Sequence, residues 1–324
     1  MKFLLPQGIG DSVWALHKIQ AVRDRIAPDE PIEVYLTCSE RNMLQDRALD
    51  FLRRFDFLSR VDMRTNYGLL NNYGNDRPPF TPGGYWDYID DGMYDFKGEK
   101  YCVLIPNAPL ERGVRLENWL PQYPIDWDIF RHFRITLQEQ AYGKMALSKI
   151  GPYAVFYPGP LHGNTIEGHN RNMLWKPAEW VELGERIHRD LGLSIVVVGA
   201  EYDRDFYTHM LAPRLNGSSV HWIDLIGRTS IGKLFAVTRN SKFLISYQSG
   251  VGIVSTYLNV PTAMWWRPRG DSISQAGFLS FEEEMASGWV PPQILESKSY
   301  LPMIYGRQKV SDIMGEIASR GWCA

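Results

Sequence analysis

The sequence predicts an α/β protein made of two Rossmann-like domains that face each other across a cleft. A strand, a glycine turn, a helix and a second strand follow one another over residues 2–37, and this βαβ order implies a parallel sheet. A second βα series begins near Gly151. The chain has 324 residues, and at about 150 residues per domain this length suits two domains. We therefore expect one domain over residues 1–149 and another over residues 150–324.

The elements of the first half follow from their hydrophobic patterns. Residues 2–5 are a short apolar strand, and apolar side chains recur at three- and four-residue spacings over residues 13–26, which predicts a helix. Residues 32–37 are β-branched and predict a strand, and a polar helical segment follows over about 40–55. The apolar run at 101–105 returns to strand.

The second half repeats this alternation. The predicted strands lie in the segments YAVFYPG, LSIVVVGAE, VHWIDLIG, KFLISY and PTAMWW. The predicted helices are PAEWVELGERIHRDLG, a segment near 230–240, the segment after SGVG and a last helix from about Val310. Pro177 is well placed in a first helical turn. We expect the last helix to return to the first domain.

Composition excludes several classes of protein. Lys and Arg number 35 against 37 Asp and Glu, so the net charge of −2 argues against coating by nucleic acid through bulk charge. The three cysteines form no C-x-x-C pair, which predicts a reducing, cytoplasmic location. No apolar run approaches the about 18 residues of a membrane span or the core of a signal peptide, so no membrane insertion is expected. The spacing of the histidines predicts no metal site.

The turn GIGDS at residues 8–12 is the first candidate site. Glycines such as Gly10 let the backbone approach a ligand, and the helix that follows offers N–H groups at its start. Asp11 lies at or near the helix N-cap, and capping alone explains an aspartate there. The third glycine of a dinucleotide fingerprint is missing.

Three further candidates follow strands of the second half. The segment after Gly159 is a phosphate cradle with Arg171 and Lys176 as cations, or else a long surface loop. Glu201 ends a buried strand, where a carboxylate binds ribose hydroxyls in dinucleotide folds, although a solvated acid fits equally. Ser249 and Gly250 open a helix and predict either an anion site or a packing turn.

The stretch from residue 66 to residue 127 is the candidate acceptor region. It is rich in aromatic residues, whose faces stack on sugars or on nucleobases, and it contains arginines that suit a phosphate. The candidates are Tyr85, Trp86, Arg112, Arg115 and Trp119.

These motifs resemble glycosyltransferase family nine, which includes the ADP-heptose:lipopolysaccharide heptosyltransferases. The positions that match the donor half of that family are Trp175, Pro177, Glu201, Gly227, Thr229, Ser230, Ser249, Gly250, Val260, Pro261 and Thr262. GIGDS is similar to the family's Gly-x-Gly-Asp start, and Asp11 stands where the family has its proposed catalytic base. Gln248 and Ile253 stand in place of the family's usual Asp and His, and Met173 in place of a basic residue.

The resemblance implies the GT-B fold and an inverting, metal-independent transfer of a sugar from a nucleotide-diphosphate sugar to a saccharide or lipopolysaccharide-type acceptor, without a cofactor. Asp11 would be the base in the first domain, and the donor would bind the second domain at Gly159, Arg171, Lys176, Glu201, Thr229, Ser249 and Gly250, with Gly10 nearby. We expect a monomer. Two alternatives stay open: a phage-type glycosyltransferase that modifies hydroxymethylated DNA, and a catalytically silent nucleotide-sugar-binding protein.

Overall fold

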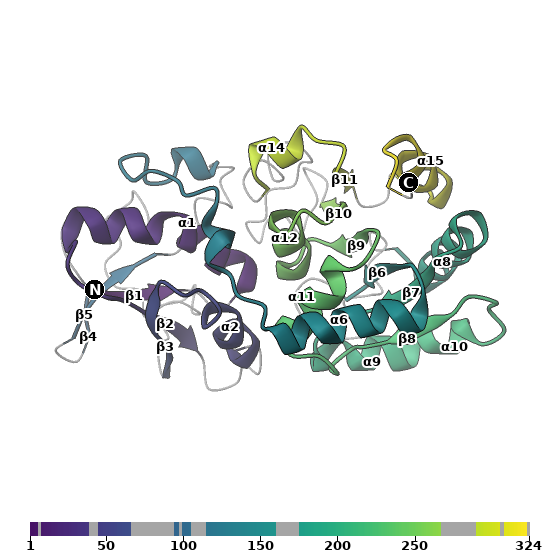
Figure 1. The fold of residues 1–324 in the computed structure, drawn as a ribbon, viewed down its shortest axis with the longest axis horizontal. Helices are drawn as coiled ribbons and strands as arrows, with labels where there is room; N and C mark the ends of the chain where they lie inside the picture. Colours follow the sequence, from purple (N-terminus) through teal and green to yellow (C-terminus); the bar gives the residue numbers. More distant parts are fainter. Residues whose placement is uncertain are drawn as a thin grey trace. The chain divides into compact units, whose positions relative to one another are not determined.

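The protein forms two compact α/β units (Figure 1). The computed structural model describes residues 1–5, 8–38, 45–65, 94–96, 99–104, 115–159, 175–266, 290–304 and 308–322. The described residues up to Arg134 belong to the first unit and those from Ile135 onward to the second. This division precedes the expected boundary at residues 149 and 150, because α6 (Leu137–Ile150) packs on α11 (Ile231–Arg239) of the second unit.

A mostly parallel sheet forms the first unit, with the strand order β3-β2-β1-β5-β4 among the described residues. The strands are β1 (Lys2–Leu5), β2 (Ile32–Cys38), β3 (Leu58–Thr65), β4 (Tyr94–Phe96) and β5 (Glu99–Val103), and the helices are α1 (Ile9–Ile26) and α2 (Gln45–Leu52). β4 pairs antiparallel with β5, and the other pairs are parallel. The predicted βαβ unit is confirmed. The expected helix over 40–55 is confirmed from Gln45 to Leu52, and residues 39–44 lie outside the described part.

Helix α1 buries two basic side chains together with its apolar face. His17 Nδ1 donates to the carbonyl oxygen of Asp126 at 2.6 Å, and Lys18 Nζ donates to that of Tyr123 at 2.7 Å. Burial lowers the pKa of His17 to about 4 and the pKa of Lys18 to about 8. Both side chains therefore hold the segment that follows η1 (Leu116–Asn118) against α1.

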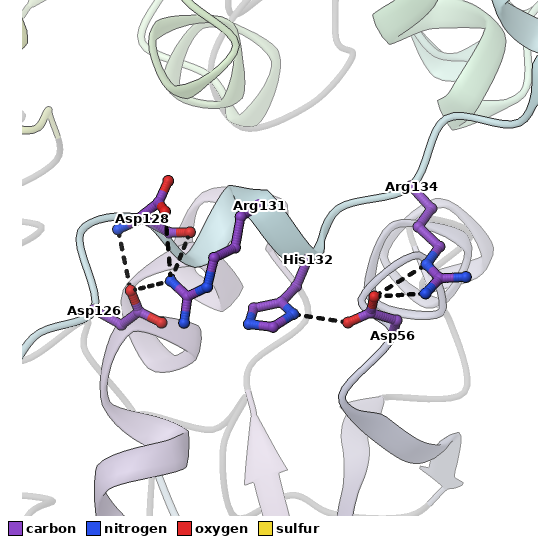
Figure 2. Close-up of polar contacts among 6 residues, drawn as sticks. All are labelled: Asp56, Asp126, Asp128, Arg131, His132 and Arg134. Carbon is purple, nitrogen blue, oxygen red and sulfur yellow. Dashed lines mark hydrogen bonds and ion pairs between the residues drawn. The ribbon is translucent and has the colours of Figure 1, made fainter.

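Contacts around Asp56 fasten the last residues of the first unit (Figure 2). The Asp56 carboxylate accepts hydrogen bonds from Arg134 Nη2 at 2.7 Å and from His132 Nδ1 at 2.8 Å. Arg131 forms a separate ion pair with Asp126 at 2.7 Å. The hydrogen bond from Arg134 holds the pKa of the Asp56 carboxyl below its ordinary value. The chain is thus bound to the first unit as far as Arg134, directly before the division.

Among the residues that the structure describes, six parallel strands form the sheet of the second unit, in the order β11-β10-β9-β6-β7-β8. They are β6 (Tyr153–Tyr157), β7 (Ser194–Val197), β8 (Trp222–Asp224), β9 (Leu244–Tyr247), β10 (Thr262–Trp266) and β11 (Tyr300–Ile304). The longer helices are α6, α8 (Pro177–Leu191), α11, α12 (Gly250–Tyr257) and α15 (Val310–Ser319), and the short ones are η2 (Ile129–His132) in the first unit and η3 (Glu201–Asp203), α9 (Arg204–Phe206), η4 (Tyr207–Leu211), α10 (Ala212–Leu215) and α14 (Pro292–Leu295) in the second.

Helices cover both faces of this sheet, as a doubly wound fold requires (Figure 1). α11 and α12 pack together on one face, and α6 packs on α11. On the other face, Phe156 and Trp265 of the strands form an apolar core with Trp180 of α8 and Ile313 of α15. The alternation of side chains along each strand accounts for these two layers.

The expectation that the last helix returns to the first domain is wrong. Val310, Ile313 and Ile317 of α15 are buried in the same core as Trp180 of α8. Their spacing of three and four residues makes one apolar stripe, which the second unit buries.

Candidate functional site

The carboxyl ends of four neighbouring strands lie along one edge of the second sheet. Tyr157 of β6 pairs with Ser246 of β9, and Val197 of β7 pairs with both Phe156 of β6 and Asp224 of β8. Because all these strands run parallel, the segments that follow them meet at the same edge. The structure therefore brings together the segments that contain Gly159, Glu201, Thr229 and Ser249, four of the predicted donor positions.

The turn after β7 is fixed by a buried carboxylate. Asp203 is 2% exposed, and its Oδ2 accepts a hydrogen bond from the backbone N–H of Ala200 at 2.8 Å. A Cβ atom at Gly159 would lie 2.5 Å from Asp203 Oδ1, and one at Gly199 would lie 2.8 Å from Oδ2. Asp203 thus packs directly on the backbone that follows β6 and β7, and both positions exclude a side chain.

Glu201 lies against the loop that follows β8. A Cβ atom at Gly227 would overlap Glu201 Oε2, and Gly227 has a φ of +66°, which favours glycine. The N–H of Gly227 donates to the carbonyl oxygen of Gly199 at 3.0 Å, so the two loops are also joined through their backbones. Glu201 is exposed, and an exposed carboxylate at this place in an α/β sheet suits a pair of ribose hydroxyls.

Two helices begin at the same edge of the sheet. Ser230 is the N-cap of α11 and accepts from Lys233 N at 3.3 Å, and Ser249 is the N-cap of α12 and accepts from Gly252 N at 3.1 Å. The hydroxyl of Ser249 is therefore occupied as a cap. The N–H groups of Gly250 and Val251 in the first turn of α12 have no hydrogen-bond partner among the described residues. Such groups and the helix dipole favour an anion.

The remaining predicted donor residues differ in their placement. Thr229 is buried, one residue before the cap of α11. Lys176 is exposed and precedes Pro177 at the start of α8, where its backbone N–H donates to Glu179. Arg171 lies outside the described residues.

In the first unit, Gly8 and not Asp11 is the N-cap of α1. Asp11 therefore lies near the N-cap, as expected, but the alternative that it serves as the cap is excluded, because the helix already includes Ile9 and Gly10. Asp11 is half-buried in the first turn, where its charge still suits the helix dipole. A Cβ atom at Gly8 would overlap Asp11 Oδ2, so the carboxylate packs on the backbone close to the carboxyl end of β1.

Two of the predicted acceptor residues are described. Trp119 is 2% exposed, and its ring centroid lies 5.7 Å from that of Trp14 on α1. Its ring therefore belongs to the core and presents no open face for stacking, contrary to expectation. Arg115 is exposed at the start of η1. Tyr85, Trp86 and Arg112 lie outside the described residues.

Three site residues escaped the sequence analysis, namely Asp203, Arg204 and Asp224. Arg204 Nη1 forms an ion pair with Asp224 Oδ2 at 2.5 Å, and Arg204 Nη2 donates to the carbonyl oxygen of Ile226. The position of Arg204 directly after Glu201 and Asp203 was a signal that the sequence offered. Its pairing with Asp224, twenty positions away, depends on the order of the strands, which the hydrophobic pattern of the sequence does not specify.

Within the described part of the chain, no group of three or more His, Cys, Asp or Glu side chains is placed to hold a metal ion. None of the described helices combines the length and the apolar character that crossing a membrane requires.

Comparisons with known proteins place the fold. No protein-family model matches the chain, and no curated protein matches it by sequence. The E. coli ADP-heptose lps heptosyltransferase II superposes with a TM-score of 0.60 at 14% identity, over 99% of this chain and 98% of that one. The glycosyl transferase family 9 protein of Veillonella parvula has a TM-score of 0.56 at 12% identity, over 98% and 96%.

A third solved structure, E. coli heptosyltransferase WaaC with ADP, has a TM-score of 0.54 at 12% identity, over 99% of this chain and 100% of that chain. These likenesses extend over nearly the whole chain, so they include both units and not a single Rossmann-like domain. The chain has the two-domain GT-B fold of these heptosyltransferases, as the sequence predicted.

Proposed function

We propose that this protein is a glycosyltransferase that moves a sugar from a nucleotide-diphosphate sugar to an acceptor hydroxyl. The observation that carries the proposal is the edge of the second sheet, where the Glu201 carboxylate lies on Gly227 and where α12 begins after β9, two strands away from β7. A carboxylate for ribose and N–H groups for phosphate are the two elements that a nucleoside diphosphate requires. The heptosyltransferases that share the fold support this interpretation.

The donor site consists of residues from the second unit. Glu201 accepts from the ribose hydroxyls, and the N–H groups of Gly250 and Val251 bind the diphosphate. Gly159 and Thr229 line the same edge of the sheet, and Lys176 with Arg171 supplies positive charge.

The reaction is a direct displacement with inversion at the anomeric carbon. The acceptor oxygen attacks this carbon while the bond to the diphosphate oxygen breaks, and the electron pair leaves with the nucleoside diphosphate. Asp11 takes the proton of the acceptor hydroxyl as general base. Main-chain N–H groups and the two cations stabilise the charge on the leaving diphosphate, so the reaction needs no metal ion.

A saccharide is the acceptor that we propose, with Arg115 and the untested positions Tyr85, Trp86 and Arg112 as its ligands. A gel-shift experiment at low salt with hydroxymethylated DNA checks this assignment. Saccharide transfer without DNA retention supports the assignment, and tight retention would replace the saccharide by DNA.

Thermal unfolding with a panel of nucleotide sugars tests donor binding. A donor that binds only the folded state raises the melting temperature, by an amount that grows with its concentration above Kd. We expect one nucleotide sugar of the panel to do so. Glu201→Ala and Ser249→Trp should abolish the rise, and the control Glu185→Ala on the exposed face of α8 should keep it. No rise with any member, or equal rises in both site variants, contradicts the proposed site.

A further inference from the structure

We propose that Arg204 is a positioning residue for ribose recognition, and that it acts by fixing Glu201 against Gly227. The inference rests on the proposed function, since it takes Glu201 as the ribose ligand. Arg204 itself touches no donor atom in this mechanism. It ties the turn that contains Glu201 to the loop that follows β8.

The contacts of Arg204 define this role. Its Nη1 pairs with Asp224 Oδ2 at 2.5 Å, and its Nη2 donates to the carbonyl oxygen of Ile226. Asp224 Oδ1 in turn accepts from the N–H of Ile226 at 2.9 Å. The guanidinium is planar with donors in fixed directions, so two simultaneous bonds orient it. The Arg204 side chain therefore fixes both the Asp224 carboxylate and the backbone directly before Gly227.

The ion pair between Arg204 and Asp224 is partly buried. The Arg204 side chain is 25% exposed and that of Asp224 is 15% exposed. Arg228 also approaches Asp224, at 3.3 Å, but its side chain is 63% exposed. Salt and water screen a partly buried pair less than an exposed one, so Arg204 is the stronger partner of Asp224.

Two neighbouring side chains, Asp203 and Arg204, anchor the same short turn to different strands. Asp203 packs on Gly159 and Gly199, and so anchors the turn to the ends of β6 and β7. Arg204 anchors the same turn to the end of β8. Without Arg204, the Asp203 anchor still holds the backbone of Glu201, and the backbone hydrogen bond from Gly227 to Gly199 remains, but the side-chain tie between the turn and the loop at Gly227 is lost. Ribose recognition should then weaken while phosphate binding at α12 persists.

Discrimination between ribose and deoxyribose measures this effect. Calorimetry gives the Kd of whichever of ADP, GDP, CDP and UDP binds the parental protein most tightly, and the Kd of its 2′-deoxy analogue. A hydrogen bond to a charged group stabilises binding by about tenfold or more, so the parental protein should prefer the ribose form by about that factor. Arg204→Met should bring the ratio close to one, and it should weaken the 2′-deoxy form less than the ribose form, because the 2′-deoxy form offers Glu201 only its 3′-hydroxyl.

Two conservative variants keep the test independent of folding. Arg204→Lys retains the charge but cannot hold both partners in a fixed orientation, so its ratio should lie between those of the parental protein and Arg204→Met. Asp224→Asn retains the size of the side chain and should lower the ratio as Arg204→Met does.

Arg320 provides a matched control. Its side chain is 23% exposed, and it also bridges a carboxylate, that of Glu316 at 3.1 Å, and a carbonyl oxygen, that of Tyr300 at 2.7 Å. It lies in the same unit but next to β11, at the opposite edge of the sheet. Arg320→Met should lower the melting temperature and keep the parental ratio.

Glu201→Ala separates the two proposals. If the parental protein shows no preference for ribose, or Glu201→Ala keeps the preference, the ribose assignment in the proposed function fails. If Glu201→Ala loses the preference but folded Arg204→Met or Asp224→Asn retains it, the role of Arg204 is refuted and the proposed function stands.

Discussion

Gly227 combines a backbone conformation that favours glycine with a direct contact to the proposed ribose ligand, Glu201. Its φ of +66° is a left-handed conformation, and the Glu201 carboxylate occupies the place of a side chain. The sequence identified Gly227 only through a resemblance, and it identified Glu201 through its place after a buried strand. The contact between them depends on the loops after β7 and β8, whose conformations no periodic pattern encodes.

Gly227→Ala should therefore impair both stability and nucleotide binding. The left-handed conformation costs an alanine about 1–2 kcal/mol, and the new methyl group must displace Glu201. Gly217→Ala is the matched control, because Gly217 has a φ of +88° and a methyl group added there would meet no atom within 4 Å. Thermal unfolding should show losses in both variants, and calorimetry should show weaker nucleotide binding in Gly227→Ala alone. Equal nucleotide affinities in the two variants would contradict the packing of Glu201 on Gly227.

His17 should make the first unit sensitive to acid. Its pKa is about 4 in the folded protein because of burial, while the ordinary value is about 6.5. Between these values the unfolded chain binds a proton that the folded protein does not, so stability falls as the pH falls from 6.5 to 4. The shift corresponds to about 3 kcal/mol at most. Urea unfolding at several pH values should show a smaller loss over this window for His17→Gln than for the parental protein, and equal losses would refute the role of His17.

At the scale of elements, four of the buried strands were predictable, whereas the buried strand β11 and the more exposed elements α6 and β3 were missed. β6, β7, β9 and β10 are fully buried, and their apolar runs are visible in the sequence. Helix α6 was missed because Gly143 is its one buried residue while Leu137 and Met145 are exposed, so it has no apolar stripe. β3 was missed although LSRVDMRT alternates apolar with charged residues, which is the pattern of a half-buried strand, and it buries Val61 alone among its described side chains.

Gly143 should be the critical residue of α6. A Cβ atom there would lie 2.6 Å from the carbonyl oxygen of Ala236 on α11, and backbone atoms cannot swing aside. Gly143→Ala should therefore separate the two helices and destabilise the protein by about 1–3 kcal/mol, as overpacking does. Gly315→Ala in α15 meets no atom within 4 Å, and it should stabilise the protein by about 0.5–1 kcal/mol through helix propensity. Chemical denaturation measures both changes, and a neutral Gly143→Ala would exclude the close contact.

At the scale of the whole molecule, the sequence predicted two α/β units and the fold neighbours confirm them at 12–14% identity. The placement of the last helix could not be derived from its pattern, because an apolar stripe does not specify which unit buries it. The same limit applies to activity, since a fold supports many functions and chemistry depends on the residues of the site. In the proposed mechanism the donor binds the second unit, and the general base belongs to the first.

A turnover assay tests this mechanism most directly. It measures the nucleoside diphosphate that is released when a saccharide acceptor is added to the protein with the nucleotide sugar that raises its melting temperature. Asp11→Asn preserves size and keeps a polar group in the first turn of α1, but an amide cannot take a proton from the acceptor. The parental protein should release the nucleoside diphosphate together with glycosylated acceptor, and Asp11→Asn should bind the donor normally with turnover lower by about 10²–10⁴-fold. Parental turnover in Asp11→Asn, or donor binding without any turnover in the parental protein, would contradict the mechanism.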